Sequence, residues 1–598
     1  MAARRSSELG SGETLDDNQI LQVLEEIPSD CESVASDTES ESDDELEEEV
    51  QGENISELEE VQGENISELH EYLPVVQVED EDTSVVDEVA AEDDAGEERR
   101  NIVWLKEVLT HDIDEFRSDP GPNISSEKGD PIEIFGCLFE DELFEHIAYH
   151  TNLYATQKLG GSTAFKPTNA DEIKTFLAIN LLMGIKKCPS YKNYWSSDPA
   201  LRDNYISANM PRNRFSWLLG YIHLNDNSQM PKKGEEGYDK LYKIRPLLEM
   251  LSKTYLKSYQ PTKMQAIDES MIRFKGRSSI KQYMPLKPIK RGYKVWIRAN
   301  SNGYISQFEI YTGKVGQTTE KCLGFRVVKT LTTDLFGKFH EVYFDNYFTS
   351  LPLMHYLRMN GVYACGTVRK HRVGLPSDFE NEKTMSRGEF QFRCSEEGLV
   401  SMFWKDRKGI YFISNYHNVT DVMSVGRRNK DGSREEITCP KLVKDYNENM
   451  GFVDKADMLK ALYEVNRKSR KWWHRIFWYF LDVTVVNAFI LYREQTNDMK
   501  KTLMKFRLSL VAGLIGAKTN TPTRAKKSSN LPKKFKPYVA PGLRYDKTSH
   551  MPKRGSSRRC AQCSTKKEPH RTKWFCETCE VGLCMTKDKN CFNVYHKK

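Results

Sequence analysis

The chain has 598 residues and equal numbers of basic and acidic residues, 87 of each, so several folded units and linkers are expected. The charge is unevenly spread, because residues 1–98 hold 35 acidic and two basic residues, which leaves 85 basic and 52 acidic residues elsewhere. Such a basic body attracts polyanions such as nucleic acid. No secretion signal or membrane span is expected, because the longest apolar stretch, Phe477 to Tyr492, is interrupted by Asp482 and Asn487.

Residues 1–100 are rich in Asp, Glu and Ser and hold too few apolar residues to form a core, so we predict a disordered acidic tail. Within it the segment VQGENISELEE at 50–60 recurs as VQGENISELHE at 61–71. Two copies are too few for a repeat domain. A tandem duplication is therefore the simpler interpretation.

Residues 101–262 show apolar side chains at helical spacing and are predicted to be all-α. Between 263 and 371 the pattern changes to short strands in the order β-β-β-α-β-α-β, with the helices at Leu323 to Phe336 and Leu351 to Met359. The Asn-Ser-Asn-Gly sequence at 300–303 predicts a hairpin turn between the second and third strands. This order is typical of a mixed sheet with helices packed on it.

The remaining segments are predicted from changes in pattern and charge. Residues 372–442 are a turn-rich insert that predicts a small β subdomain, and 443–460 form a helix. Helices continue through 461–523, including a long aromatic one around Trp472 to Tyr492. Residues 524–559 form a basic linker with 12 Lys and Arg and one acid, suited to nuclear import or phosphate contact.

Three aspartates stand where a sheet-based nuclease needs metal ligands. Asp268 lies inside the first predicted strand, Asp345 ends the fourth, and Asp454 opens a helix after the insert. Carboxylates are the ligands Mg²⁺ prefers, and two such ions stabilise the attacking and leaving oxygens of a phosphoryl displacement. Strand alternation places Glu269 on the opposite face, which suggests a structural role. Asp457 shares the helical face of Asp454, and either aspartate suits the third position.

Residues 560–598 hold a cysteine pattern of two CxxC pairs followed by further Cys and His. The ligands it predicts are Cys560, Cys563, Cys576, Cys579, Cys584, Cys591 and His596. Thiolate and imidazole suit tetrahedral Zn²⁺, and two interleaved zinc ions are expected. Seven ligands leave one position open, for His570, a residue not recognised in the pattern, or water. A ubiquitin-ligase RING is disfavoured, because the second pair, CETC, lacks the histidine that motif carries there.

The chain resembles the piggyBac transposase family from about Phe135 to His596. The segments that carry the resemblance are YWSSDP, MPRNRF, YIHLND, YDKLYKIRP, AIDES, GYKVW, VYFDNYFTS, CGTVRK, DYNENMGFVDKADM and RKSRKWWHRIFWYF. It implies a multidomain α+β protein with an RNase H-like mixed α/β catalytic core at 263–371 and 443–460. The resemblance further implies that the inserted β subdomain interrupts this core and that an all-α dimerisation and DNA-binding region at 101–262 and 461–523 flanks it. It also implies that the zinc-binding cysteine-rich domain at 560–598 recognises transposon-end DNA.

The resemblance also implies residue roles and an activity. It places the catalytic, Mg²⁺-binding triad on Asp268, Asp345 and Asp454, with Asp457 as an additional acid. It places DNA contacts on Arg369, Lys370, Arg372 and Trp472, although core packing of Trp472 is an equal alternative. The family implies two Mg²⁺ ions, with Mn²⁺ as a substitute, and a nuclear homodimer that binds double-stranded DNA at transposon terminal inverted repeats and inserts at TTAA targets.

Two other functions are compatible with the same features. A domesticated DNA-binding protein would keep the fold and zinc module without transposition. A zinc-dependent chromatin adaptor would use the acidic tail and need little of the body. The presence of all three aspartates favours the transposase.

Overall fold

The structure is a computed structural model, and the residues it describes all belong to the unit Val75–Lys598. They are 102–159, 165–313, 320, 322–428, 432–469, 471–516, 539, 544–545, 550–565, 567–586 and 588–597. The predicted acidic tail at 1–100, with its repeat, lies outside these residues, as does most of the predicted linker at 524–559.

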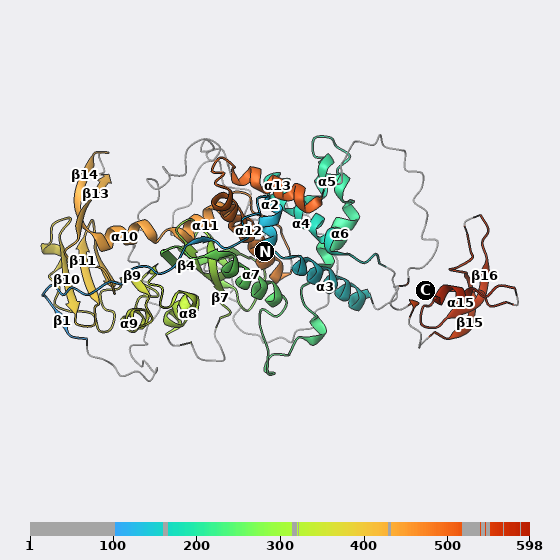
Figure 1. The fold of residues 1–598 in the computed structure, drawn as a ribbon, viewed down its shortest axis with the longest axis horizontal. Helices are drawn as coiled ribbons and strands as arrows, with labels where there is room; N and C mark the ends of the chain where they lie inside the picture. Colours follow the sequence, from blue (N-terminus) through green and yellow to red (C-terminus); the bar gives the residue numbers. More distant parts are fainter. Residues whose placement is uncertain are drawn as a thin grey trace, which may run out of the picture. The chain divides into compact units, whose positions relative to one another are not determined.

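The segment 102–262 is mainly helical, as its apolar spacing predicts (Figure 1). Its helices are α2 (Pro131–Leu138), α3 (Asp141–Leu159), α4 (Ala170–Ile185), α5 (Asn204–Asn209), α6 (Arg212–Tyr221) and α7 (Arg245–Ser258), with 3-10 turns at Tyr191–Trp195 and Asn227–Gln229. Local signals start them: the Asn169 side chain accepts from the Glu172 amide at the start of α4. Three short strands are also present, β1 (Trp104–Leu105), β2 (Gly121–Pro122) and β3 (Tyr259–Gln260).

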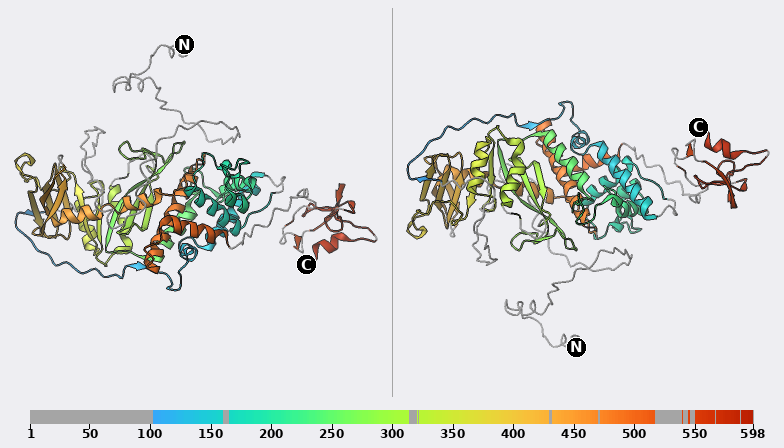
Figure 2. Two further views of the ribbon diagram at one scale, coloured as in Figure 1. Left: turned by 90° about the horizontal axis from the view of Figure 1, so that it is seen from above. Right: turned by 90° about the horizontal axis from the view of Figure 1, so that it is seen from below.

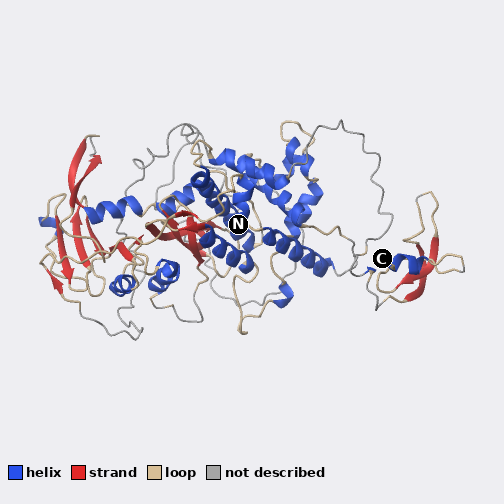
Figure 3. Cartoon of the chain, viewed as in Figure 1, coloured by secondary structure: helices blue, strands red, loops and turns tan. Residues whose placement is uncertain are grey.

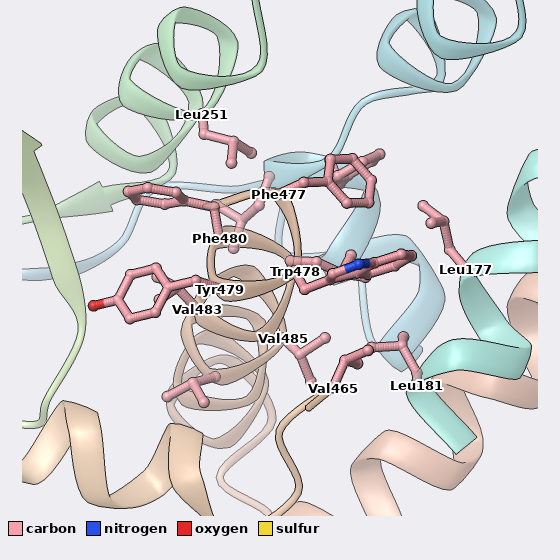
Figure 4. Close-up of a cluster of buried hydrophobic side chains, with 14 of the residues drawn as sticks. Leu177, Leu181, Leu251, Val465, Phe477, Trp478, Tyr479, Phe480, Val483 and Val485 are labelled. Carbon is pink, nitrogen blue, oxygen red and sulfur yellow. The ribbon is translucent and has the colours of Figure 1, made fainter. Parts of the chain in front are cut away.

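The long aromatic helix α12 (Trp472–Thr496) is the centre of the largest core, and α13 (Leu503–Ile515) follows it. Every residue from Ile476 to Tyr492 is buried, as expected for a helix that is apolar on all sides. Figure 4 shows the aromatic side chains of α12 among residues of α4 and α7, including Leu177, Leu181 and Leu251. By length and hydropathy α12 resembles a membrane span, but 94% of that apolar window is buried inside the protein.

The two polar residues that interrupt this apolar stretch have partners. Asp482 accepts a 2.8 Å hydrogen bond from Arg507 of α13, and both side chains are almost fully buried. Asn487 exchanges two 2.9 Å hydrogen bonds with the backbone of Ile305 in β7 (Ile305–Ile310). The Asp482–Arg507 pair joins α12 to α13, and the Asn487 hydrogen bonds join α12 to β7.

A mixed sheet contains the strands of the predicted order β-β-β-α-β-α-β, and strands are drawn in red in Figure 3. The elements are β4 (Met264–Arg273), β6 (Arg291–Asn300), β7, α8 (Leu323–Thr332), β8 (Glu341–Phe344), α9 (Leu351–Met359) and β9 (Tyr363–Val368), with an additional short strand β5 (Gln282–Tyr283) and a 3-10 turn at Thr333–Leu335. β4, β6 and β7 pair antiparallel, whereas β8 lies parallel between β4 and β9. The predicted hairpin turn joins β6 to β7, and Gly303 adopts a φ of 90° there.

Helices cover both faces of this sheet, as the views of Figure 2 show. Alternate strand residues divide between two cores: Ile267 packs with α8 and α9, and Ala266 packs with the helical core of α12. Asp268 therefore points toward the α12 side and Glu269 toward the α8 side at their Cβ atoms.

The predicted β subdomain at 372–442 continues the same sheet. Its strands are β10 (Phe390–Ser395), β11 (Val400–Lys405), β12 (Gly409–Ser414), β13 (Val422–Arg428) and β14 (Arg434–Pro440), with a 3-10 turn at Glu382–Thr384. β12 pairs with β9, β10 and β11 extend the sheet to β1, and β13 and β14 form a hairpin of their own. The helices α10 (Lys441–Asn449) and α11 (Phe452–Ala461) then follow, and α11 lies against β4 and β6.

The cysteine-rich region has its own small fold. β15 (Pro552–Arg559) pairs antiparallel with β16 (Arg571–Cys576), and α15 (Cys591–His596) follows. Val581, Leu583, Phe592 and Tyr595 are buried together with the cysteines. β15 lies within the predicted linker, so this folded region begins before Cys560.

Candidate catalytic and metal-binding sites

The structure places Asp268, inside β4, next to Asp345, which directly follows β8. The two strands are parallel, and their last paired residues are Ile267 and Phe344. Asp268 directly follows Ile267, and Asp345 directly follows Phe344. The two carboxylates therefore lie side by side, with ligand atoms within 4.8 Å of one another. Backbone amides fix one oxygen of each: the Glu269 amide donates to Asp268 over 2.7 Å, and the Tyr347 amide to Asp345 over 3.0 Å.

Glu269 joins this cluster, contrary to the purely structural role that strand alternation suggests. Its carboxylate also lies within 4.8 Å of the ligand atoms of Asp268 and Asp345. β8 ends beside Ile267, so no neighbouring strand blocks that edge of β4. A Glu side chain is long enough to reach around the free edge from the opposite face. We call Asp268, Glu269 and Asp345 the acidic cluster.

The charges of the acidic cluster work against one another. Burial and the Glu269 carboxylate raise the pKa of Asp268 well above its ordinary value, and the same two causes raise the pKa of Asp345 to about 6. Burial also opposes ionisation of Glu269, but Lys294 and Lys287 outweigh it and lower its pKa. The metal-free cluster therefore holds more negative charge than it readily accommodates.

Asp454 and Asp457 lie on α11 next to the acidic cluster but outside it. Asp454 is exposed in the first turn of α11, and its charge acts on Lys287, as do those of Asp268 and Glu269. Asp457 has local partners: it accepts a hydrogen bond from Ser270 and lies 3.8 Å from Lys460. The structure thus gives Asp457 neighbours that hold it in place and leaves Asp454 facing solvent.

The acidic cluster fits a hard divalent cation. Three carboxylates, two inside β4 and one directly after β8, supply oxygen ligands, and each aspartate keeps an oxygen beyond the one fixed by a backbone amide. The exposed Asp454 adds a further carboxylate from the neighbouring helix. This donor set resembles an oxygen-coordinated Mg²⁺ or Mn²⁺ site rather than a zinc site.

The cysteine-rich region forms two groups of four ligands. Cys560, Cys563, Cys584 and Cys591 make one, and His550, Cys576, Cys579 and His596 make the other. The Cys563 and Cys584 sulfurs are 3.7 Å apart, which matches two ligands of a tetrahedral ion with Zn–S bonds of about 2.3 Å. The two groups alternate along the chain, in the order His550, Cys560 with Cys563, Cys576 with Cys579, Cys584 with Cys591, and His596. The two candidate sites are therefore interleaved.

His550 takes the eighth position in the two groups, which the spacing did not reveal, and His570 belongs to neither group. The Nδ1 atom of His550 lies 3.3 Å from the Cys576 sulfur and 3.4 Å from that of Cys579. His550 precedes β15, which carries it to the second CxxC pair at the end of β16. His596 bonds the Phe592 carbonyl through Nδ1 over 2.8 Å, which turns its Nε2 toward Cys579.

The predicted DNA contacts are at the surface to different degrees. Arg369 and Lys370 are exposed directly after β9, and Arg372 is half-buried in the turn that follows. Trp472 is half-buried at the start of α12 with its ring 6.3 Å from that of Tyr293, whereas Trp473 is 2% exposed. Trp473 therefore belongs to the core, and part of the Trp472 indole remains open to a ligand.

Comparison with known proteins decides the family. A family model described as Transposase IS4 matches residues 130–489, more than half of the chain. The human PiggyBac transposable element-derived protein 3 is 30% identical over 469 residues, covering 76% of this chain and 74% of that protein. The chain belongs to the piggyBac family. The human PiggyBac transposable element-derived protein 2 is 28% identical over 441 residues, covering 72% of this chain and 73% of that protein.

A solved structure shows the same fold. The piggyBac transposase in a synaptic complex with hairpin DNA matches with a TM-score of 0.59 and 23% identity, over 79% of this chain and all of that chain. This piggyBac-family protein is therefore transposase-like in sequence and fold. The family implies use of a divalent metal, for which the acidic cluster is the candidate site.

Proposed function

We propose that this protein is a DNA transposase that excises and inserts DNA by cut-and-paste phosphoryl transfer at TTAA sites. The observation that carries the proposal is the acidic cluster, which lies where the parallel pairing of β4 and β8 ends in a transposase-like fold. The order of strands and helices around it agrees with the RNase H-like core that the family resemblance implies, and this supports the same reaction.

Asp268, Asp345 and Asp454 are the proposed metal-binding triad. These carboxylates would hold divalent ions, which would supply stabilisation of the attacking and leaving oxygens of the displacement. The backbone amides of Glu269 and Tyr347 hold the two sheet aspartates in place, and Asp454 lies in the first turn of a helix packed on β4. A covalent side-chain nucleophile is not required. Water would attack a phosphodiester and displace its 3′ oxygen, and the 3′-hydroxyl so freed would attack a second phosphodiester and displace the 3′ oxygen of that one.

The proposed substrate is double-stranded DNA carrying terminal inverted repeats, held by a nuclear homodimer. Support comes from the excess of basic residues outside the acidic tail, and from the DNA in the solved relative's complex. Arg369, Lys370, Arg372 and Trp472 are the proposed DNA contacts.

The cysteine-rich region is proposed to bind two Zn²⁺ ions and to recognise transposon ends. Its hairpin exposes basic side chains stacked on aromatic rings: the Arg554 guanidinium lies 5.3 Å from the centre of the Trp574 ring, and Arg558 lies 4.5 Å from that of Phe575. Stacking presents the guanidinium groups at the surface, as phosphate recognition requires.

A denaturing-gel cleavage assay tests the function. The substrate is DNA flanking the protein's own gene, with Mg²⁺, and the variants are Asp268→Ala and, as a control, Glu448→Gln, an acid with a 57% exposed side chain on α10. We expect nicks and hairpins at TTAA boundaries, lost in Asp268→Ala and kept in the control. Binding without cleavage by the wild type would instead support a domesticated DNA-binding protein.

A further inference from the structure

Lys287 turns inward from the mostly exposed stretch 285–290, whereas Phe274 and Ile280 earlier in the same segment are buried. It lies on residues 274–290, which connect β4 to β6 and include β5. The preceding residue, Leu286, is 75% exposed, whereas the Lys287 side chain is 35% exposed and its Nζ lies 3.2 Å from a carboxylate oxygen of Glu269. One ion pair thus fastens this segment to the acidic cluster.

The Lys287 ammonium is surrounded by the acids of the site. Burial disfavours its charge, but Asp268 and Glu269, with Asp454, hold its pKa above the ordinary value. Its charge also acts on Asp345 and on Asp457. The charge of Lys287 thus interacts with all five of these carboxylates.

Lys294 contacts the same Glu269 but is placed differently. Its Nζ is 3.7 Å from the other carboxylate oxygen and lies 4.7 Å from the centre of the Tyr347 ring. Lys294 belongs to β6, which pairs on both sides, and its side chain is 13% exposed. It is therefore held by the sheet, whereas Lys287 is carried by a surface segment and can leave.

We propose that the Lys287 ammonium occupies the place of a divalent cation in the acidic cluster and is displaced from it when the metal binds. The proposal rests on the metal-binding role proposed above for the acidic cluster. Three carboxylates within 4.8 Å repel one another, and a single ammonium offsets part of that repulsion. A dication offsets more of it, and the flexible lysine stem allows the ammonium to withdraw. Lys294 then remains as the partner of Glu269.

Mn²⁺ affinity distinguishes this role from a structural one. We would titrate the full-length zinc-loaded protein with Mn²⁺ and follow the free ion by electron paramagnetic resonance. The dissociation constant of interest is that of the Mn²⁺ binding which the substitution Asp268→Asn abolishes. Lys287→Gln should tighten that dissociation constant by about tenfold or more, because a competing charge is removed at close range. Lys287→Arg should stay close to the wild type. Lys290→Gln is the matched control, since it removes the same charge from an exposed position of the same segment.

The outcomes separate the inference from the proposed function. Unchanged or weaker Mn²⁺ binding in Lys287→Gln, with Asp268-dependent binding intact in the wild type, would overturn the inference alone. If the wild type bound no Asp268-dependent Mn²⁺, the metal-binding role and the inference would both fail. Equal tightening in Lys290→Gln would show a general charge effect and would also overturn the inference.

Trypsin accessibility gives a second measurement that does not depend on affinity. In the wild type, Mn²⁺ should speed cleavage after the exposed Lys290, because the stretch around Lys287 loses its contact with Glu269. In Lys287→Gln this bond should be cleaved quickly with or without Mn²⁺. Thermal unfolding of each variant would confirm that it folds, and wild-type cleavage that Mn²⁺ leaves unchanged or slows would contradict the displacement.

Discussion

Asp268 and Asp345 are neighbours because each follows the last paired residue of two parallel strands, Ile267 and Phe344. The end of β8 has two consequences. It places the two carboxylates at the same level, and it frees the edge of β4 around which Glu269 reaches them. The site therefore holds like charges at close range, at a cost to stability that a bound cation would remove.

Asp345→Asn is expected to stabilise the protein in the absence of added divalent ions. Burial and Glu269 raise the pKa of Asp345 from 3.8 to about 6. Between these values the folded protein binds a proton that the unfolded chain has released, so the free energy of unfolding falls as pH rises through this window. At pH 8 the substitution should raise the free energy of unfolding by as much as about 3 kcal/mol, and near pH 4 it should change that free energy little. Thermal unfolding at both pH values measures this, and an equal gain at both would contradict it.

Arg507→Met is expected to destabilise the helical core by about 3 to 5 kcal/mol, because it leaves the Asp482 carboxylate buried without its partner. Arg507 is 2.8 Å from Asp482, and it also donates to the Leu181 carbonyl of α4. Urea unfolding followed by tryptophan fluorescence measures the loss. Lys257→Met is the control, since its pair with Glu140 is exposed and should contribute less than about 1 kcal/mol. Similar losses in both variants would refute the assignment.

His550→Ala is expected to remove one of two bound zinc ions. His550 completes the group with Cys576, Cys579 and His596, while the four-cysteine group does not use it. Metal analysis of the purified protein should give about one zinc per chain for His550→Ala and about two for His570→Ala. Loss of zinc in His570→Ala, with retention in His550→Ala, would reverse the assignment.

Replacement of Arg369 and Lys370 by Ala is expected to weaken DNA binding in a salt-dependent manner. Both side chains are exposed directly after β9. Each lost phosphate contact reduces, by about one, the magnitude of the negative slope of log binding constant against log salt concentration. Fluorescence anisotropy with labelled duplex DNA over a range of salt concentrations measures the slope. The same double change at Lys253 and Lys257, exposed on α7, should leave the slope unchanged. Equal effects would mean that these two positions are not special contacts.

Local patterns predicted much of the architecture. The strand and helix order around Asp268 and Asp345 follows from hydrophobic periodicity, and the turn at 300–303 from its Asn and Gly residues. Helix α9 has the predicted bounds, Leu351–Met359. The six cysteines of the metal-binding groups were visible in their spacing, since two CxxC pairs bring ligands together within a short loop.

The sequence by itself determined the family, the element order and the residues whose chemistry is written in short motifs. Only the tertiary structure decided that Glu269, Lys287 and His550 belong to the sites. Glu269 depends on where a neighbouring strand ends, Lys287 on how a surface segment folds back, and His550 on a strand that carries it to distant cysteines. Each is a contact between separate parts of the chain, set by packing and strand pairing, so no local pattern reports it.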